Sequence, residues 1–186
     1  MGKRLLDITV SALLLLALLP LLLPLAIAIS LADGGPPFYS QLRIGRGLKQ
    51  FRMWKFRSMR VDADRIGGYS TETNDPRVTR IGRFIRRTSI DELPQLFNVF
   101  RGEMSLVGPR PLVTAQLQAL APEIAIMRHT LRPGMTGLAQ ISGRSALSDS
   151  DTLRLDLQYA ASASLCQDLR ILLATPAAVL GMRGTN

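Results

Sequence analysis

The chain has 186 residues, a formal net charge of +9, 20% charged residues and 47% hydrophobic residues, which excludes a disordered polyelectrolyte and a large multi-domain machine. Its 1 cysteine and 1 histidine exclude a disulfide framework and a cysteine-based zinc site, so acid, base or nucleophile chemistry falls to the 14 carboxylates. Nearly all of the 23 basic residues are arginines, whose planar fork binds phosphate in a bidentate way.

Positions 8–32 form an uncharged, apolar segment. A helix of this length measures about 37 Å and could cross a bilayer. Pro20 and Pro24 lie within the segment and predict a bend. Basic residues lie on both sides of the segment, so the positive-inside rule places both ends in the cytoplasm. The residues alone leave a spanning helix and a re-entrant helix open, and the two prolines argue against a signal peptide. At the edge of the segment we expect Asp7 to pair with Arg4 or to be solvated.

The positive charge is concentrated in the first part of the chain. Residues 1–102 carry a net charge of +8 and residues 103–186 a net charge of +1, and between positions 41 and 60 there are seven basic residues and no acidic one. Such a stretch next to a membrane segment favours anionic phospholipids, at about 1 kcal/mol per residue. No nucleic acid is expected as a partner, because aromatic residues are only 5% and no reader motif is present.

The remaining pattern predicts a mostly helical α+β fold with a short β-hairpin or strands. A strand is expected to begin at Phe38, a second to cover 50–57, and a mobile loop to cover 62–77. The spacing of Ser164 and Gln167 is that of a capping box, and the apolar face that follows predicts an interfacial helix. Helices are expected over 82–87, 91–100, 112–130 with a break at Pro122, and from Ser164 towards Pro176.

The stretch around Asp91 and Glu92 is the candidate catalytic centre. Ser89 and Glu92 have capping-box spacing, so both carboxylates are expected in the first turn of a helix, where the helix dipole keeps them ionised. An ionised aspartate can attack phosphorus, and a carboxylate can bind Mg²⁺. The alternative is that both residues only stabilise the helix.

Arginines on both sides of this pair favour a phosphorylated substrate. Arg86 and Arg87 lie just upstream, and Arg110 stands between two prolines that restrict the backbone. A rigid arginine, an arginine cluster and two carboxylates suit phosphoryl transfer. No P-loop motif is present, which argues against a nucleoside triphosphatase.

In these residues the chain resembles the small monotopic phosphoglycosyl transferases of the bacterial sugar transferase family. The likeness runs from Lys3 to about Thr175. The stretches that carry it are Lys3-Arg4-x-x-Asp7 with Pro20, Gln41-x-Arg43-x-Gly45, KFRSM from Lys55, SIDELPQLFNVFRGEMSLVGPRP from Ser89, LRPG from Leu131, GLAQISGR ending at Arg144, and Asp156-x-x-Tyr159.

The resemblance implies transfer of a phospho-sugar from a UDP-sugar to undecaprenyl phosphate with release of UMP, as the first membrane step of glycan or exopolysaccharide assembly. It implies Asp91 as the nucleophile that forms a covalent intermediate and Glu92, with Asp91, as the Mg²⁺ ligand. The substrate- and phosphate-binding residues are then expected to be Lys55, Arg86, Arg87, Arg110, Arg144, Asp156 and Tyr159.

The same resemblance implies a re-entrant helix over 1–36 and a catalytic domain over 37–186, at the cytoplasmic face of the bacterial inner membrane. The chain is expected to be the minimal catalytic form, and a homo-oligomer is left open. Two other functions compete with this interpretation: a non-enzymatic module that binds anionic lipids, and a phosphatase of polyprenyl pyrophosphate.

Overall fold

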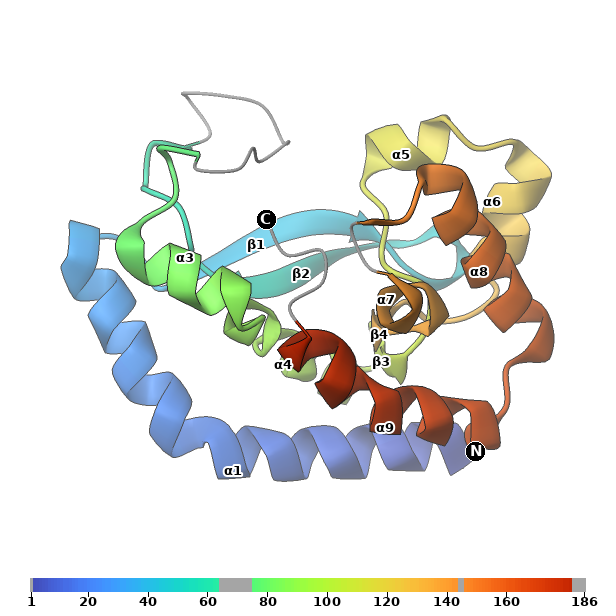
Figure 1. Cartoon of the computed structure of the whole chain (residues 1–186), viewed down its shortest axis with the longest axis horizontal. Helices are drawn as coiled ribbons and strands as arrows, with labels where there is room; N and C mark the ends of the chain where they lie inside the picture. The colour runs from blue at the N-terminus through green and yellow to red at the C-terminus, as the bar shows by residue number, and fades with distance from the viewer. Residues whose placement is uncertain (1, 64–74, 144–145, 182–186) are drawn as a thin grey trace.

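The computed structural model describes residues 2–63, 75–143 and 146–181. Within these ranges the chain is mostly helical with short strands, as the sequence predicted, and the strands form two small two-stranded sheets (Figure 1). Most of the loop expected over 62–77 falls outside the described residues. The elements are α1 (Gly2–Asp33), β1 (Phe38–Ile44), η1 (Arg46–Leu48), β2 (Gln50–Phe56), α3 (Arg80–Arg87), η2 (Ile90–Glu92), α4 (Gln95–Arg101), β3 (Ser105–Val107), α5 (Thr114–Gln118), α6 (Pro122–Arg128), β4 (Gly134–Thr136), α7 (Leu138–Ser142), α8 (Asp149–Ser162) and α9 (Leu165–Leu180).

Helix α1 is long and apolar enough to cross a membrane by its length and composition. Most of its large side chains are exposed, among them Leu13, Leu16 and Leu31. Pro20 and Pro24 lie inside the helix, and Figure 1 shows that α1 runs along the base of the molecule and changes direction partway. Much of the apolar surface of α1 is therefore not covered by the rest of the described chain.

The first turns of α1 are anchored to the remainder of the fold by hydrogen bonds of Asp7 and Arg4. Asp7 is buried and accepts hydrogen bonds from Ser105 Oγ at 3.0 Å and from the backbone N–H of Leu106 at 2.9 Å. Arg4 donates to two carbonyls at the C-terminal end of α4, at 2.6 and 2.7 Å. The expectation that Asp7 pairs with Arg4 or is solvated is therefore wrong, because a buried carboxylate must be satisfied and β3 supplies the donors.

Strands β1 and β2 form an antiparallel hairpin whose register pairs Phe38 with Phe56 and Ile44 with Gln50. Both strands agree with the sequence prediction. Alternation along β2 buries Phe51 and Met53 and leaves their neighbours Gln50 and Arg52 exposed. One face of the hairpin therefore packs on the core.

The main core lies between the hairpin, α4, β3 and the two C-terminal helices. The buried amide of Asn98 joins α4 to β2, because it accepts from the N–H of Trp54 at 3.0 Å and donates to the carbonyl of Arg52 at 2.7 Å. The buried apolar side chains of this core are Phe51, Met53, Leu96, Val99, Met104, Leu106, Val107, Tyr159 and Ile171.

The helix expected over 91–100 forms differently. Ser89 has a left-handed backbone with a φ of 57° and makes no side-chain cap hydrogen bond, so the expected capping box does not form. The 3₁₀ turn η2 follows, and α4 starts only at Gln95 with Pro94 as its N-cap. Asp91 and Glu92 therefore precede the α-helix and do not lie in its first turn.

The other helices mostly follow the prediction. Helix α3 covers the expected 82–87, and α5 and α6 are separated before Pro122. Ser164 caps α9 by accepting from the N–H of Gln167, as expected, but the helix continues through Pro176 to Leu180. The sequence reasoning missed α7, α8 and the strand pair β3–β4.

The parallel pair β3–β4 determines where the loop after β3 lies. Ser105 pairs with Gly134 and Val107 with Thr136. A Cβ at Gly134 would lie 2.0 Å from the backbone nitrogen of Gly108, so only glycine permits this close approach. The loop after β3 and the connection from β4 to α7 are thereby packed backbone against backbone.

Candidate active site

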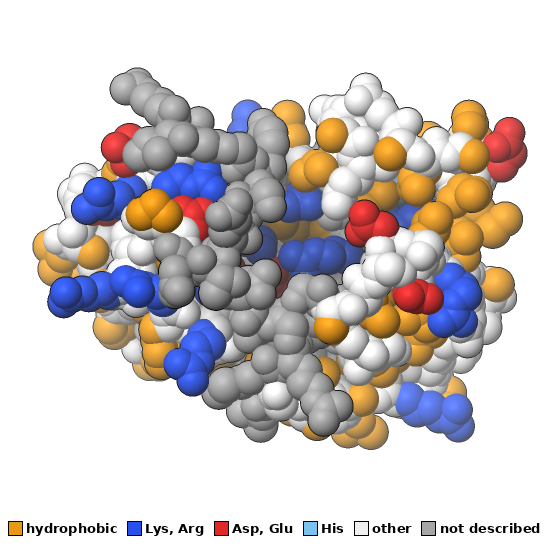
Figure 2. Space-filling model, turned by 45° about the horizontal axis from the view of Figure 1, so that its top comes forward, with side chains coloured by type: hydrophobic (Ala, Val, Ile, Leu, Met, Phe, Trp, Pro, Cys, Tyr) orange, Lys and Arg blue, Asp and Glu red, His pale blue; other side chains and the backbone are white. Residues whose placement is uncertain are grey.

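A large cleft of about 1630 Å³ opens above the core. Figure 2 shows Lys and Arg side chains gathered in a hollow at the centre of this face. The cleft is bounded by the hairpin, α3, η2, the loop after β3, and helices α7, α8 and α9. Segments far apart in the sequence thus converge on one basic depression.

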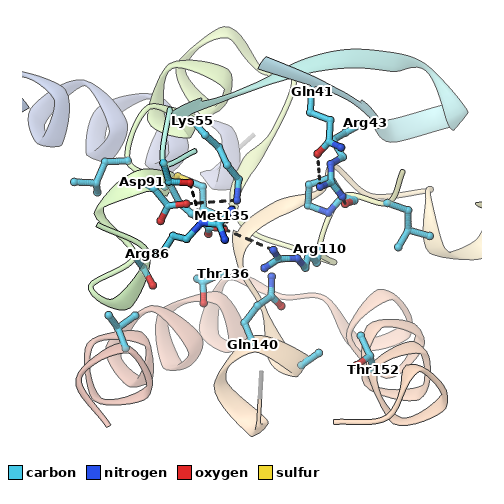
Figure 3. A pocket seen from close by; sticks show the side chains of 18 of the residues that line it. Gln41, Arg43, Lys55, Arg86, Asp91, Arg110, Met135, Thr136, Gln140 and Thr152 are labelled. Carbon is cyan, nitrogen blue, oxygen red and sulfur yellow. Dashed lines mark hydrogen bonds and ion pairs between the residues drawn. The ribbon is translucent and has the colours of Figure 1, made fainter. Parts of the chain in front are cut away.

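Asp91 is a buried acidic residue that lines the cleft together with Lys55 and Arg110. It is 7% exposed and lies in the short turn η2, which the left-handed backbone of Ser89 starts. Figure 3 shows its carboxylate facing the side chain of Lys55. A tight turn therefore places the carboxylate of Asp91 at the wall of the cleft.

Lys55 comes from β2 and contacts both members of the carboxylate pair. Its Nζ lies 2.7 Å from Oε1 of Glu92 and 3.9 Å from Oδ2 of Asp91. The hydrogen bonds of Asn98 hold α4 against β2. Because η2 directly precedes α4, they also hold Asp91 and Glu92 near Lys55. The sequence prediction placed these three charged residues in one site, and the structure brings them together.

Arg110 reaches Glu92 from the loop after β3. Its Nη2 lies 3.7 Å from Oε1 of Glu92, and the side chain is half exposed to the cleft. The flanking backbone is held in place because Gly108 donates to the carbonyl of Thr136 and Gly134 donates to the carbonyl of Pro109, both at 2.9 Å. The arginine is thus presented from a fixed loop with its guanidinium available to a ligand.

Arg86 approaches Asp91 from α3. Its Nε donates to Ser58 Oγ at 2.8 Å, and burial lowers its pKa while the charge of Asp91 opposes that change. Helix α3 lies very close to Ser58, which follows the end of β2, since a Cβ at Gly82 would lie 1.8 Å from the carbonyl oxygen of Ser58. Gly82 and Ser58 therefore fix the position of Arg86.

Burial controls the ionisation of Asp91. Desolvation raises the pKa of its carboxyl group from 3.8 to about 6; Lys55 opposes this rise, Glu92 adds to it, and Arg86 and Arg110 oppose it. The expected stabilisation by a helix N-terminus is not the dominant influence. Above pH 6 most of the carboxylate is nonetheless ionised, and its poor solvation makes it more basic than an ordinary aspartate.

Asp156 lines the cleft but is already paired. Its Oδ2 accepts from Nε and Nη2 of Arg128 at 3.0 and 2.5 Å, and both side chains are buried. Burial raises the pKa of Asp156, and Arg128 opposes this. Arg128 also donates to the backbone carbonyl of Arg110 at 2.6 Å. The geometry gives Asp156 the role of holding Arg128, which in turn supports the arginine loop.

The other expected binding residues are not all in the cleft. Tyr159 is buried in the core, where its hydroxyl donates to Asp168 at 2.5 Å, and it does not line the cleft. Burial and the neighbouring Asp168 raise its pKa. Arg87 lies at the end of α3 and also does not line the cleft. Arg144 lies outside the described residues.

Several lining residues were not predicted as site residues. Arg43 lies in the strand β1, where burial lowers its pKa to about 10 with a further decrease from Arg110. It donates to the carbonyl of Pro111 at 3.0 Å and so braces the arginine loop. Its place in the stretch from Gln41 to Gly45 was a usable signal. Gln140 had the same kind of signal, because it lies in the stretch GLAQISGR that ends at Arg144, whereas nothing in the sequence around Arg128 distinguishes that residue.

The donor set of the cleft fits a magnesium ion only together with a substrate. Among the described residues no group of three or more His, Cys, Asp or Glu side chains could hold a metal. Asp91 and Glu92 supply two adjacent carboxylates, and Mg²⁺ is commonly bound by one or two carboxylates together with water and substrate phosphates. Phosphate oxygens would have to complete such a site.

Comparison with known proteins identifies the family. Residues 1–182 match the model of the family described as bacterial sugar transferase, and the chain belongs to this family. It is 50% identical to the undecaprenyl-phosphate glucose phosphotransferase of Komagataeibacter xylinus, and the match covers 93% of this chain and 35% of that protein. It is 41% identical, over 93% of its residues, to 39% of the UDP-glucose:undecaprenyl-phosphate glucose-1-phosphate transferase of Escherichia coli (strain K12).

The chain therefore spans well under half the length of these two relatives. The exopolysaccharide production protein PSS of Rhizobium leguminosarum bv. phaseoli, in contrast, is matched over nearly its whole length. It is 43% identical to this chain, and the match covers 93% of this chain and 92% of PSS. The family assignment made from the sequence motifs is confirmed.

Proposed function

We propose that this chain transfers a phospho-sugar from a UDP-sugar to undecaprenyl phosphate and releases UMP. The names of two relatives point to these substrates, because they describe transfer of glucose or glucose 1-phosphate to undecaprenyl phosphate. The observation that carries the proposal is the environment of Asp91: a buried carboxylate, with a pKa of about 6, faced by Lys55, Arg86 and Arg110 in one cleft.

In the first step Asp91 acts as the nucleophile. One carboxylate oxygen forms a bond to the phosphorus that carries the sugar, and the bond from this phosphorus to the bridging oxygen breaks. UMP leaves with that electron pair, so no proton is needed at the leaving group. Desolvation favours attack, because a carboxylate with a raised pKa gains more from forming a bond than a solvated one does.

Three cations can stabilise the charge that moves during this step. Lys55 and Arg86 lie beside Asp91, and Arg110 reaches across from the loop after β3 (Figure 3). Phosphoryl transfer depends mainly on positioning and charge neutralisation, which fixed arginines supply. Glu92 holds Lys55 at 2.7 Å and so keeps its ammonium group next to the nucleophile.

In the second step the phosphate oxygen of the lipid attacks the same phosphorus. The bond to Asp91 breaks and its carboxylate is regenerated, which leaves a sugar joined to the lipid by a diphosphate. The enzyme therefore alternates between a free and an esterified form, which predicts ping-pong kinetics.

Mg²⁺ is the expected cofactor, and Glu92 and Asp91 would hold it together with substrate phosphates. It would supply positive charge to the phosphate oxygens. Lys55 now occupies Oε1 of Glu92, so binding of a metal there requires the ammonium group to share this carboxylate. Loss of turnover in excess chelator, restored by added Mg²⁺, would support this role, and full turnover in chelator would contradict it.

The shape and anchoring of α1 support a re-entrant helix at the cytoplasmic face of the inner membrane. Arg4 near one end bonds to α4, while Asp33 at the other end pairs with Arg57, which follows β2 in the same folded body. A straight helix of this length would place its ends about 48 Å apart and on opposite sides of a bilayer. A bend at Pro20 and Pro24 permits both ends to stay on one side.

Exposed apolar residues outside α1 support interfacial helices. Phe97 and Phe100 project from α4, and Leu165, Leu169 and Leu173 project from α9. In Figure 1 both helices lie on the side of the molecule along which α1 runs. In this arrangement residues 1–36 enter the membrane and residues 37–186 form a catalytic domain that rests on its surface.

The proposal is tested by incubating the purified chain in detergent or nanodiscs with undecaprenyl phosphate and a panel of UDP-sugars. We expect UMP and a lipid-linked sugar from at least one donor. The Asp91→Asn variant should form neither, while Asp151→Asn, a change at a half-exposed aspartate that does not line the cleft, should behave as the wild type. UMP release that persists in Asp91→Asn, or orthophosphate release without any nucleotide, would contradict the mechanism.

A further inference from the structure

Gln140 lines the cleft, and its side-chain amide lacks the hydrogen-bond partners that a buried amide normally has. It lies in α7 and lines the cleft, and both amide atoms are buried. Within the described part of the chain neither atom has a hydrogen-bond partner. Figure 3 shows the amide pointing from α7 towards Arg110. A buried amide without partners costs about 1–3 kcal/mol, so this position favours a ligand that would satisfy it.

The surrounding backbone fixes where this amide lies. A Cβ at Gly137 would lie 2.6 Å from Oε1 of Gln140 and 2.3 Å from the carbonyl oxygen of Gly108. The glycine therefore makes room for the amide and packs α7 against the loop that carries Arg110. Helix α7 also packs on α8 and α9. The side chain is thus held beside Arg110 by the same close packing that positions the arginine.

The chemistry of the amide differs from that of its charged neighbours. Arg110 has only donors and suits the acceptor oxygens of a phosphate, whereas a carboxamide has both a donor and an acceptor. A sugar hydroxyl also has both and can satisfy the two amide atoms together with a neighbouring hydroxyl. Arg110 lies 3.7 Å from Glu92, next to the proposed nucleophile, which places its guanidinium where a phosphate that Asp91 attacks would be bound.

We propose that Gln140 binds hydroxyl groups of the donor sugar and helps to determine which sugar is transferred. This inference rests on the proposed function, since it assumes that the reacting phosphate lies between Asp91 and Arg110. The proposal places the sugar, and not the nucleotide, beside Gln140. The residue contributes to selection of the donor and not to the bond-making step.

Gln140→Leu separates a ligand-binding role from a structural one. The change keeps most of the side-chain volume and removes an unpaired amide, so the melting temperature should stay equal or rise. For the preferred donor kcat/KM should fall at least about tenfold, because the contacts with the hydroxyl groups are lost. Gln158→Leu, at an exposed glutamine outside the cleft, serves as the matched control and should leave kcat/KM unchanged.

Monodeoxy donors locate the contact. Wild-type enzyme is assayed with UDP-glucose or UDP-galactose, whichever it turns over, and with monodeoxy analogues of that sugar. Removal of the hydroxyl group bound by Gln140 should lower kcat/KM for the wild type and have little further effect in Gln140→Leu. A deoxy penalty that is equal in both enzymes at every position would overturn the proposal.

Inhibition by UDP distinguishes the sugar from the nucleotide. If Gln140 contacts the sugar, UDP should inhibit the wild type and Gln140→Leu with the same Ki. A Ki that rises with the loss of kcat/KM would show that the amide contacts the nucleotide and would overturn the proposal. The two proposals also fail separately: turnover by Asp91→Asn contradicts the proposed function, whereas wild-type donor kinetics in Gln140→Leu contradict the sugar contact alone.

Discussion

Lys55 lies closer to Glu92 than to the neighbouring Asp91: its ammonium nitrogen is 2.7 Å from Oε1 of Glu92 and 3.9 Å from Oδ2 of Asp91. The two adjacent carboxylates therefore have different surroundings. Glu92 orients the lysine through a direct hydrogen bond, while Asp91 experiences its charge over a longer distance, where attraction is weaker. This difference suits one carboxylate to positioning and the other to attack on phosphorus.

Replacing Lys55 should shift the pH dependence of activity. Lys55 holds the pKa of Asp91 below the value that burial alone would give, so Lys55→Met should raise that pKa above about 6. Because attack requires the ionised carboxylate, the acidic limb of kcat/KM should move to higher pH, in addition to a fall in the plateau. Lys55→Arg keeps the charge and should keep the limb near its wild-type pH. An acidic limb at the same pH in all three enzymes would contradict this account.

The Asp91→Asn variant should be inactive and yet more stable than the wild type at pH 7.5. The folded protein holds this carboxyl group with a pKa of about 6 against 3.8 as the ordinary value, so ionisation above pH 6 costs up to about 3 kcal/mol of folding free energy. The amide carries no such cost. The gain in the free energy of unfolding should disappear as pH falls from 6 towards 4. Thermal unfolding at several pH values measures it, and a variant less stable at pH 7.5 would argue against the desolvated charge.

The sequence predicted the chemistry of the site better than its local geometry. The motifs around Asp91, Arg110 and Lys55 identified residues that the structure brings into one cleft. The capping box at Ser89 was wrong, because the backbone there is left-handed and the spacing of a motif does not report φ. The contact of Asp7 with β3 depends on tertiary packing between segments about 100 residues apart, which no local pattern encodes.

The sequence also did not predict the ion pair between Arg128 and Asp156. This pair leads to a prediction about stability. Both side chains are buried, and Arg128 also donates to the backbone of Arg110. Arg128→Met should lower the free energy of unfolding by about 3–5 kcal/mol, because it leaves Asp156 as an unpaired buried charge. The double variant Arg128→Met/Asp156→Leu should recover much of this loss. Denaturant unfolding in detergent measures both, and equal stability of single and double variants would contradict the pairing.

The two ends of α1 should be accessible from the same side of the membrane. In a Cys166→Ser background, which removes the single cysteine, Gly2→Cys and Pro36→Cys each place one thiol at an exposed position on either side of the apolar segment. A membrane-impermeant maleimide should label both in inside-out vesicles and neither in intact spheroplasts. Labelling of the two positions from opposite sides would establish a spanning helix.

The covalent intermediate on Asp91 is the central claim, and intact-protein mass spectrometry followed by peptide mapping tests it most directly. The chain is incubated with UDP-glucose or UDP-galactose in the absence of any lipid phosphate and quenched. The account predicts a mass increase of one hexose phosphate on the peptide that contains Asp91, lost when undecaprenyl phosphate is added. Complete turnover by an enzyme that never carries this adduct, or an adduct on a different residue, would contradict it.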